Sequence, residues 1–199
     1  MSGTVESVTT LPAVKRYIAT HDAHGKSVYF DSPPQQYYPV PGAGGLARSY
    51  SVATVPSKLE NDEDLKAYLG KEGPTSWTSP NIVTPGGANL LIVDLSPGGK
   101  SFMHQTVSID FSVCVVGEID RSHLQFEAML TLPAHADELD NGEKVRLRPG
   151  DHIVRRGTMH RWHNASSTEP ARLVVTTLSC LPFDIAGKQL EEIHLPNEQ

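Results

Sequence analysis

Short apolar runs separated by turn residues dominate this chain of 199 residues. Its 16 Gly and 15 Pro interrupt runs rich in Val, Ile and Leu. Because branched residues favour extended backbone whereas Gly and Pro favour turns, the pattern predicts short antiparallel strands. We expect a sandwich or barrel of the all-β class. The expected strands lie at 13–19, 28–30, 89–95, 106–119, 143–151, 152–156 and 171–178.

The segment 103–111, MHQTVSIDF, carries the first chemical signal. Side chains alternate along a strand, so His104, Thr106 and Asp110 share one face, whereas Val107 and Ile109 share the other. An ordinary surface strand would bury the apolar face and expose the polar one. The alternative places the polar face inward, where it would line a functional site.

The remaining segments are expected to form one domain with this strand-rich core. Residues 1–84 combine opening strands, a Pro/Gly-rich connection at 31–45 and a short helix at 61–70. Residues 85–180 form the expected barrel core. Residues 181–199 form a tail, which we expect to be helical at 184–195.

Composition narrows the compartment and the partners. The net charge is −6 and no run of Lys or Arg is present, so we expect no nucleic-acid partner. The chain has no apolar run of membrane-spanning length and no signal-peptide pattern, so we expect a cytoplasmic protein without membrane contact. Cys114 and Cys180 each lie in an apolar run, which predicts buried, reduced thiols.

Two blocks of sequence resemble the paired motifs of the cupin superfamily. They are PGGKSFMHQTVSIDFSVCVVGE at 97–118 and RPGDHIVRRGTMHRWHN at 148–164. The chain is most similar to single-domain cupins with His-x-Thr-x-Ser-x-Asp followed by Arg-Gly-Thr-x-His-x-Trp. The resemblance implies a single cupin β-barrel, also called a jelly roll or double-stranded β-helix, with one or two short peripheral helices. Thr106 replaces the usual second His, and Asp110 replaces the usual Glu.

The resemblance also implies a metal site. His104, Asp110 and His160 match ligand positions and would together hold one divalent ion, namely Fe, Mn, Ni or Zn. The hydroxyl of Thr106 is a weaker ligand than the imidazole it replaces. Metal-free catalysis is therefore the alternative, in which Asp110 orients an imidazole for proton transfer near neutral pH.

Further residues around these motifs are candidates for substrate contact. Arg155 and Arg156 alternate in direction, and we expect Arg156 to face inward and anchor a carboxylate or enolate, unless it forms a surface ion pair. Met103 and Thr106 are further candidates, and Trp162 is a substrate wall or a core residue. We expect five further histidines to be structural or solvated: His21, His24, His152, His163 and His194.

An insertion at 121–137 separates the two blocks. It is expected to be a surface excursion or a dimer contact, with a lid over the barrel as the alternative, and His123 and His135 are expected to lie in it, outside the site. The resemblance also implies a homodimer, formed through the outer face that carries Val107, Ile109 and Phe111.

The resemblance implies a small-molecule enzyme of secondary metabolism. The leading hypothesis is a lyase or isomerase that dehydrates, decarboxylates or shifts a proton in an oxygenated polyketide-like or aromatic intermediate, with His104, Asp110, His160 and Arg156 as catalytic residues. The first alternative is a metal-dependent dioxygenase. The second is a small-molecule-binding protein that has lost its catalytic activity. Thr106 in place of the usual His would be the sign of that loss.

Overall fold

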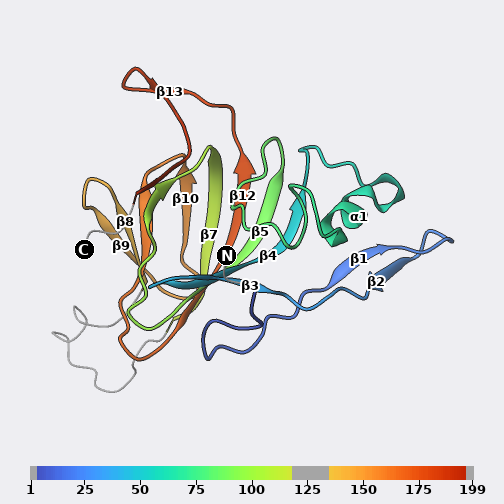
Figure 1. Cartoon of the computed structure of the whole chain (residues 1–199), viewed down its shortest axis with the longest axis horizontal. Helices are drawn as coiled ribbons and strands as arrows, with labels where there is room; N and C mark the ends of the chain where they lie inside the picture. The colour runs from blue at the N-terminus through green and yellow to red at the C-terminus, as the bar shows by residue number, and fades with distance from the viewer. Residues whose placement is uncertain (1–3, 118–134, 196–199) are drawn as a thin grey trace.

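Two antiparallel sheets form the body of the protein in a computed structural model that describes residues 4–117 and 135–195 (Figure 1). Nearly all of the expected insertion at 121–137 lies outside the described residues. The first sheet has the strand order β10-β7-β12-β5-β4-β3. Its strands are β3 (Tyr37–Val40), β4 (Gly44–Val52), β5 (Ala88–Leu95), β7 (Ser108–Val116), β10 (His152–Arg156) and β12 (Ala171–Ser179).

The second sheet has the order β15-β6-β11-β8-β9. Its strands are β6 (Met103–Gln105), β8 (His135–Leu139), β9 (Lys144–Leu147), β11 (His160–Asn164) and β15 (Ile193–Leu195). One buried apolar cluster joins the sheets, because Leu91 and Leu173 of the first pack in the same core as Leu147 and Trp162 of the second. The all-β, jelly-roll class expected from the sequence is confirmed.

Strand β7 points its polar side chains into the molecule. Ser108, Asp110 and Ser112 are buried, whereas Phe111 and Val115 remain 43% and 40% exposed. The alternation is therefore the reverse of an ordinary surface strand, as the interior reading of 103–111 requires. A polar lining of this kind needs partners inside the molecule. Ser108 donates a hydrogen bond to Asp110, and Arg155 on the neighbouring strand β10 donates one to Ser112.

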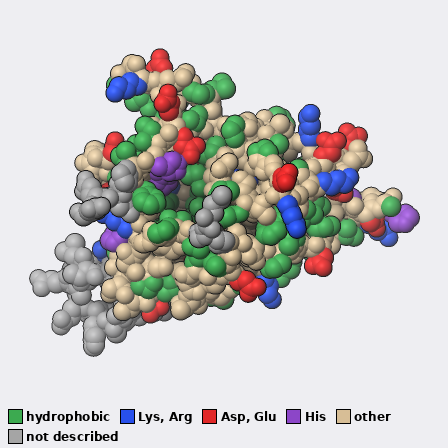
Figure 2. All heavy atoms as spheres, viewed as in Figure 1, with side chains coloured by type: hydrophobic (Ala, Val, Ile, Leu, Met, Phe, Trp, Pro, Cys, Tyr) green, Lys and Arg blue, Asp and Glu red, His purple; other side chains and the backbone are tan. Residues whose placement is uncertain are grey.

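Smaller elements lie outside the two main sheets (Figures 1 and 2). A hairpin of β1 (Ile18–His21) and β2 (Ser27–Phe30) projects from one side. The expected helix is present as α1 (Glu63–Leu69), which follows the short η1 (Glu60–Asp62) and buries Leu65 and Tyr68. No helix among the described residues is long and apolar enough to cross a membrane. Both cysteines are free thiols, and Cys114 is fully buried while Cys180 is partly buried.

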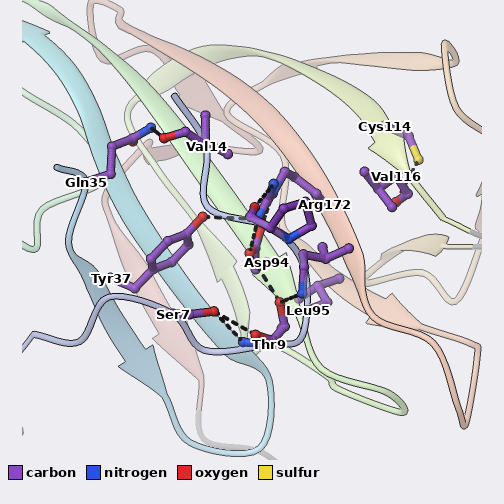
Figure 3. A network of polar contacts seen from close by, with 12 residues as sticks. Ser7, Thr9, Val14, Gln35, Tyr37, Asp94, Leu95, Cys114, Val116 and Arg172 are labelled. Atoms are coloured by element: carbon purple, nitrogen blue, oxygen red, sulfur yellow. Dashed lines mark hydrogen bonds and ion pairs between the residues drawn. The ribbon is translucent and has the colours of Figure 1, made fainter. Parts of the chain in front are cut away.

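The N-terminal segment covers part of the outer face of the first sheet (Figure 3). Arg172 on β12 donates two hydrogen bonds of 2.6 Å to the carboxylate of Asp94 on β5, and both residues are buried. Arg172 also donates to the carbonyl oxygen of Pro12, and Thr9 donates to Asp94. This buried ion pair therefore ties the segment to the sheet.

The tail differs from the expected helix. It forms a small hairpin of β13 (Asp184–Ile185) and β14 (Lys188–Gln189), which projects in Figure 1, and then β15. Between the hairpin strands, Ala186 and Gly187 have positive φ values of 50° and 80°, which a helix does not allow. The edge of β6 then pairs with β15, and this long-range pairing overrides the local helical pattern.

Candidate active site in the cavity between the sheets

A cavity of about 370 Å³ opens between the two sheets. Its walls are mostly apolar, so it suits the body of a small organic molecule. The polar side chains gather mainly on β6, β7, β10 and β11 and on the C-terminal strand β15. The apolar lining includes Val40, Ala43, Leu46, Ile82, Leu91, Val93, Leu95, Phe102, Trp162 and Val175.

Two imidazoles face each other in this cavity. His104 on β6 and His160 on β11 are register partners, and their ring centroids are 4.4 Å apart. The Nδ1 atom of His104 lies 2.9 Å from the carbonyl oxygen of Phe102, and that of His160 lies 2.9 Å from the carbonyl oxygen of Thr158. A carbonyl oxygen only accepts, so each Nδ1 carries the hydrogen and each Nε2 keeps a lone pair.

Both imidazoles are held in the neutral form. Burial lowers the pKa of His104, and the nearby His194 and Arg155 lower it further. Burial, followed by the charges of Arg155 and His104, lowers the pKa of His160 to about 2. At neutral pH the pair therefore offers two acceptors and no positive charge.

The cation of the site is Arg155, which is 3% exposed. It donates a hydrogen bond of 2.9 Å to Ser112 and forms an ion pair of 2.6 Å with Asp137 on the opposite sheet. Its guanidinium carbon lies 3.9 Å from the ring centroid of Trp162. Its buried Nε–H has no hydrogen-bond partner among the described residues, which is costly unless a ligand supplies an acceptor.

The carboxylate of Asp110 ends a chain of hydroxyl groups on one strand face. Ser108 donates a hydrogen bond of 2.6 Å to Asp110, so the 2.7 Å contact between Thr106 and Ser108 has Thr106 as its donor. Burial raises the pKa of Asp110, while Ser108 and Arg155 oppose that rise. Thr106 and Asp110 both line the cavity.

The structure decides between the two adjacent arginines. Arg156 was expected to face inward, and this prediction is wrong: Arg156 is exposed and Arg155 lines the cavity. The register explains the difference, because Arg155 pairs with the inward Asp110 and Arg156 pairs with the outward Ile109. The predicted contacts Thr106 and Trp162 line the cavity, whereas Met103 is not among the lining residues.

Comparison with known proteins gives the family. No family model matches the chain. The chain is 40% identical over 178 residues, covering 88% of this chain and 83% of the relative, to phomopsin biosynthesis cluster protein D of Diaporthe leptostromiformis. It is 31% identical over 178 residues, covering 88% and 79%, to the cupin-domain-containing oxidoreductase srdB of Neurospora crassa. The chain belongs to the cupin family.

A solved structure also resembles part of this cupin. The polyketide cyclase RemF of Streptomyces resistomycificus matches with a TM-score of 0.35 and 14% identity, covering 56% of this chain and 63% of that chain. This similarity is too low to support a functional conclusion.

The donor set of this cupin does not form the expected metal site. His104 and His160 lie together, but Asp110 accepts a hydrogen bond from Ser108 and stands beside Arg155 on the neighbouring strand, and Thr106 brings only a hydroxyl. Among the described residues, no group of three or more His, Cys, Asp or Glu side chains is placed to hold a metal ion. The three predicted ligands line one cavity without converging as a ligand set.

Sequence reasoning missed three polar residues of the site. Asp137 neutralises Arg155 from the opposite sheet, and Glu192, just before β15, and His194 on β15 line the cavity. His194 was expected to be a solvated residue of the tail, but its ring stacks on His104 with the centroids 5.8 Å apart. The inward direction of Arg155 could have been predicted by pairing it with Asp110. No local sequence pattern identifies His194 as a site residue.

Proposed function

We propose that this cupin is an enzyme of secondary metabolism, a lyase or isomerase that moves a proton next to a carbonyl group in an oxygenated, partly aromatic small molecule. One observation carries the proposal. Two neutral imidazoles with free Nε2 lone pairs lie in an apolar cavity beside a buried arginine whose Nε–H is without a partner among the described residues. Such a site combines a base with an anchor for a developing oxyanion.

The chemistry assigns one task to each group. An Nε2 of the His104 and His160 pair accepts the α-proton, and the electrons of the broken C–H bond move into the carbonyl to form an enolate. The enolate oxygen accepts a hydrogen bond from Arg155. Return of the proton at another carbon completes an isomerisation, and loss of a β-hydroxyl group as water, with the proton returned to it, completes a dehydration. No electron acceptor is consumed in either case.

The basicity of His160 depends on what lies against Arg155. Burial and the charge of Arg155 hold the pKa of His160 at about 2, which is too low for a base near neutral pH. A substrate oxygen that carries negative charge against Arg155 offsets that charge and raises the pKa of the imidazole. Binding of the correct substrate would therefore activate the base, and water alone would not.

A metal-dependent oxidoreductase is the second candidate. The observation that favours it is that several relatives, including srdB, are named cupin-domain-containing oxidoreductases. In that case an added metal would be required for activity, and oxygen would be consumed. The donor set described above offers two imidazoles to such a metal.

Phenylpyruvate is a suitable probe for the first proposal because it joins an aromatic ring to acidic CH₂ protons, a ketone and a carboxylate. Exchange of its CH₂ protons for deuterium in D₂O is followed by proton NMR. We expect the wild-type protein to accelerate exchange by about a hundredfold or more over buffer. The variant His160→Gln is expected to return the rate to the buffer level with a nearly unchanged melting temperature.

Three controls separate the candidate functions. The assay is repeated with a chelator, with added Fe(II), and with an oxygen electrode. Exchange that persists with chelator and consumes no oxygen supports the lyase or isomerase. Oxygen uptake that requires Fe(II) supports the oxidoreductase instead. Binding of phenylpyruvate without any exchange, in wild type and variants alike, would leave a non-catalytic binding protein.

A further inference from the structure

The C-terminal strand β15 lies along the mouth of the cavity. It pairs antiparallel with β6, so that His194 stands opposite His104 and Ile193 opposite Gln105. Gln105 also donates a side-chain hydrogen bond of 2.9 Å to the carbonyl oxygen of Glu191. Because side chains alternate along an extended chain, Glu192 and His194 point to the same side. The pairing with β6 turns that side toward the cavity, which both residues line.

One apolar side chain also anchors the tail to the body. Within residues 181–195, only Leu190 is buried, at 2% exposure, whereas Leu181 is 88% exposed. Leu190 packs against Gly157 in the turn between β10 and β11, where a Cβ atom would lie 2.7 Å from its Cδ2. Gly157 also has a φ of 66°, so glycine meets both needs of the turn. We call Leu190 and Gly157 the tail latch.

His194 and Glu192 form a polar pair in the tail, just after the tail latch. The Nε2 of His194 donates a hydrogen bond of 2.8 Å to Oε1 of Glu192 when the imidazole is neutral, which leaves Nδ1 as an acceptor. The His194 ring is nearly parallel to that of His104, at 6°. The site thus has a row of three imidazoles that runs from the buried His160 to the half-exposed His194.

We propose that the C-terminal strand forms one wall of the substrate-binding site. His194 contacts a hydroxyl or other donor group of the substrate, Glu192 orients His194, and the tail latch holds both in place. This inference rests on the proposed function for the nature of the ligand. The carboxylate of Glu192 fixes the tautomer of His194, in the way that carboxylates orient imidazoles in other sites. Glu192 is therefore a positioning residue and His194 a binding residue.

The test uses the affinity of the full-length protein for 3-(4-hydroxyphenyl)pyruvate and for phenylpyruvate, measured by calorimetry. The first ligand adds one phenol donor to the second. For His194→Phe, which keeps an aromatic ring against His104, we expect about a tenfold loss of affinity for the hydroxylated ligand and little loss for phenylpyruvate. Glu192→Gln should give the same selective loss to a smaller degree, whereas Glu191→Gln, the same change one position away, should give none.

The latch is tested with two matched variants of the tail. Leu190→Asp should weaken binding of the hydroxylated ligand about tenfold and speed amide hydrogen exchange in 191–195, whereas Leu181→Asp should change neither quantity. Leu190→Ala serves as a milder variant should Leu190→Asp not fold, and it should give effects in the same direction.

The outcomes separate the two proposals. Wild-type binding of both ligands with unchanged affinities in His194→Phe and in the latch variants would overturn the inference and leave the proposed function standing. Equal losses for both ligands in His194→Phe would also overturn the contact to the phenol group. A wild-type protein that binds neither ligand overturns the proposed function, and the inference with it.

Discussion

Two adjacent arginines on β10 differ in burial, and only one of them belongs to the site. Arg155 is buried and touches Ser112, Asp137 and Trp162, whereas Arg156 is exposed. Taking a guanidinium out of water is expensive, and the hydrogen-bonded carboxylate of Asp137 offsets only part of that cost. Burial lowers the pKa of Arg155, and Asp137 opposes this, so the group remains the cation of the site. Among the described residues its Nε–H has no partner, and a buried cation of this kind is typical of a binding site.

Replacing each arginine by Met tests this division. Arg155→Met leaves Asp137 buried and uncompensated, so we expect a loss of about 3–5 kcal/mol in unfolding free energy. The double variant Arg155→Met with Asp137→Asn should recover much of that stability but not the affinity for phenylpyruvate, which should stay at least about tenfold below wild type. Arg156→Met should change neither. Urea unfolding and calorimetry measure both quantities, and an Arg156 variant with weakened binding would contradict the assignment.

Strands β8 and β11 are joined by charge as well as by backbone pairing. Arg161 on β11 donates hydrogen bonds of 2.7 and 2.9 Å to both carboxylate oxygens of Glu138, its register partner on β8. Lys144 on β9 adds a third contact at 3.5 Å. The same strands carry Asp137 and His160 into the site, so their register also sets the geometry of the cavity.

This pairing predicts a pH dependence of stability. The hydrogen bonds from Arg161, together with the charges of Arg161 and Lys144, lower the pKa of Glu138 from its ordinary value near 4.5 to about 2. The folded state therefore binds the proton less readily than the unfolded state, and the stabilising contribution is present above pH 4.5 and is lost as the pH falls toward 2. Urea unfolding across this range should show a shallower loss for Glu138→Gln than for wild type. Glu143→Gln, which changes an exposed neighbour on the β8–β9 turn, should retain the wild-type slope.

One outer face of the molecule remains apolar. The N-terminal segment covers Ile92, Ala47 and Val174 of the first sheet, but the strands at the other edge leave Phe111, Val115 and Val154 between 40% and 52% exposed. A contiguous apolar patch of this kind on a sheet is typical of an interface. We propose that a second copy of the chain covers it in a homodimer.

Light scattering coupled to size exclusion tests the dimer. The wild-type protein should be a dimer at micromolar concentration, and Phe111→Asp should shift it to monomer because a buried charge would be left without a partner in the interface. Tyr29→Asp is the matched control, since Tyr29 is 77% exposed on the β1–β2 hairpin. A wild-type monomer, or a dimer that survives Phe111→Asp, would contradict the proposed face.

Local patterns in the sequence predicted several strands, among them β5, β7, β10 and β12, and the direction of most site residues, but they missed β3, β4 and β8. The alternation in 103–111 places His104, Thr106 and Asp110 on one face, and the structure lines a cavity with them. The two motif blocks predicted that His160 reaches the same place, and their resemblance to cupin motifs agrees with the family that the relatives show. Strand alternation has a period of two, so one inward residue settles the direction of its neighbours on the same strand.

Only the tertiary structure decided which residues from different strands meet. Arg155 faces inward because β10 pairs with β7 in the register that sets it opposite Asp110, and the sequence of β10 alone permits either parity. The tail was expected to be helical, but β15 pairs with the edge of β6 and Leu190 packs against Gly157. These contacts hold the end of the tail as a strand and place His194 opposite His104. Likewise Asp110 and the two histidines line one cavity, but among the described residues they do not form a group of three that could hold a metal ion. Contacts between residues far apart in the chain depend on long-range pairing and packing, and no local period encodes them.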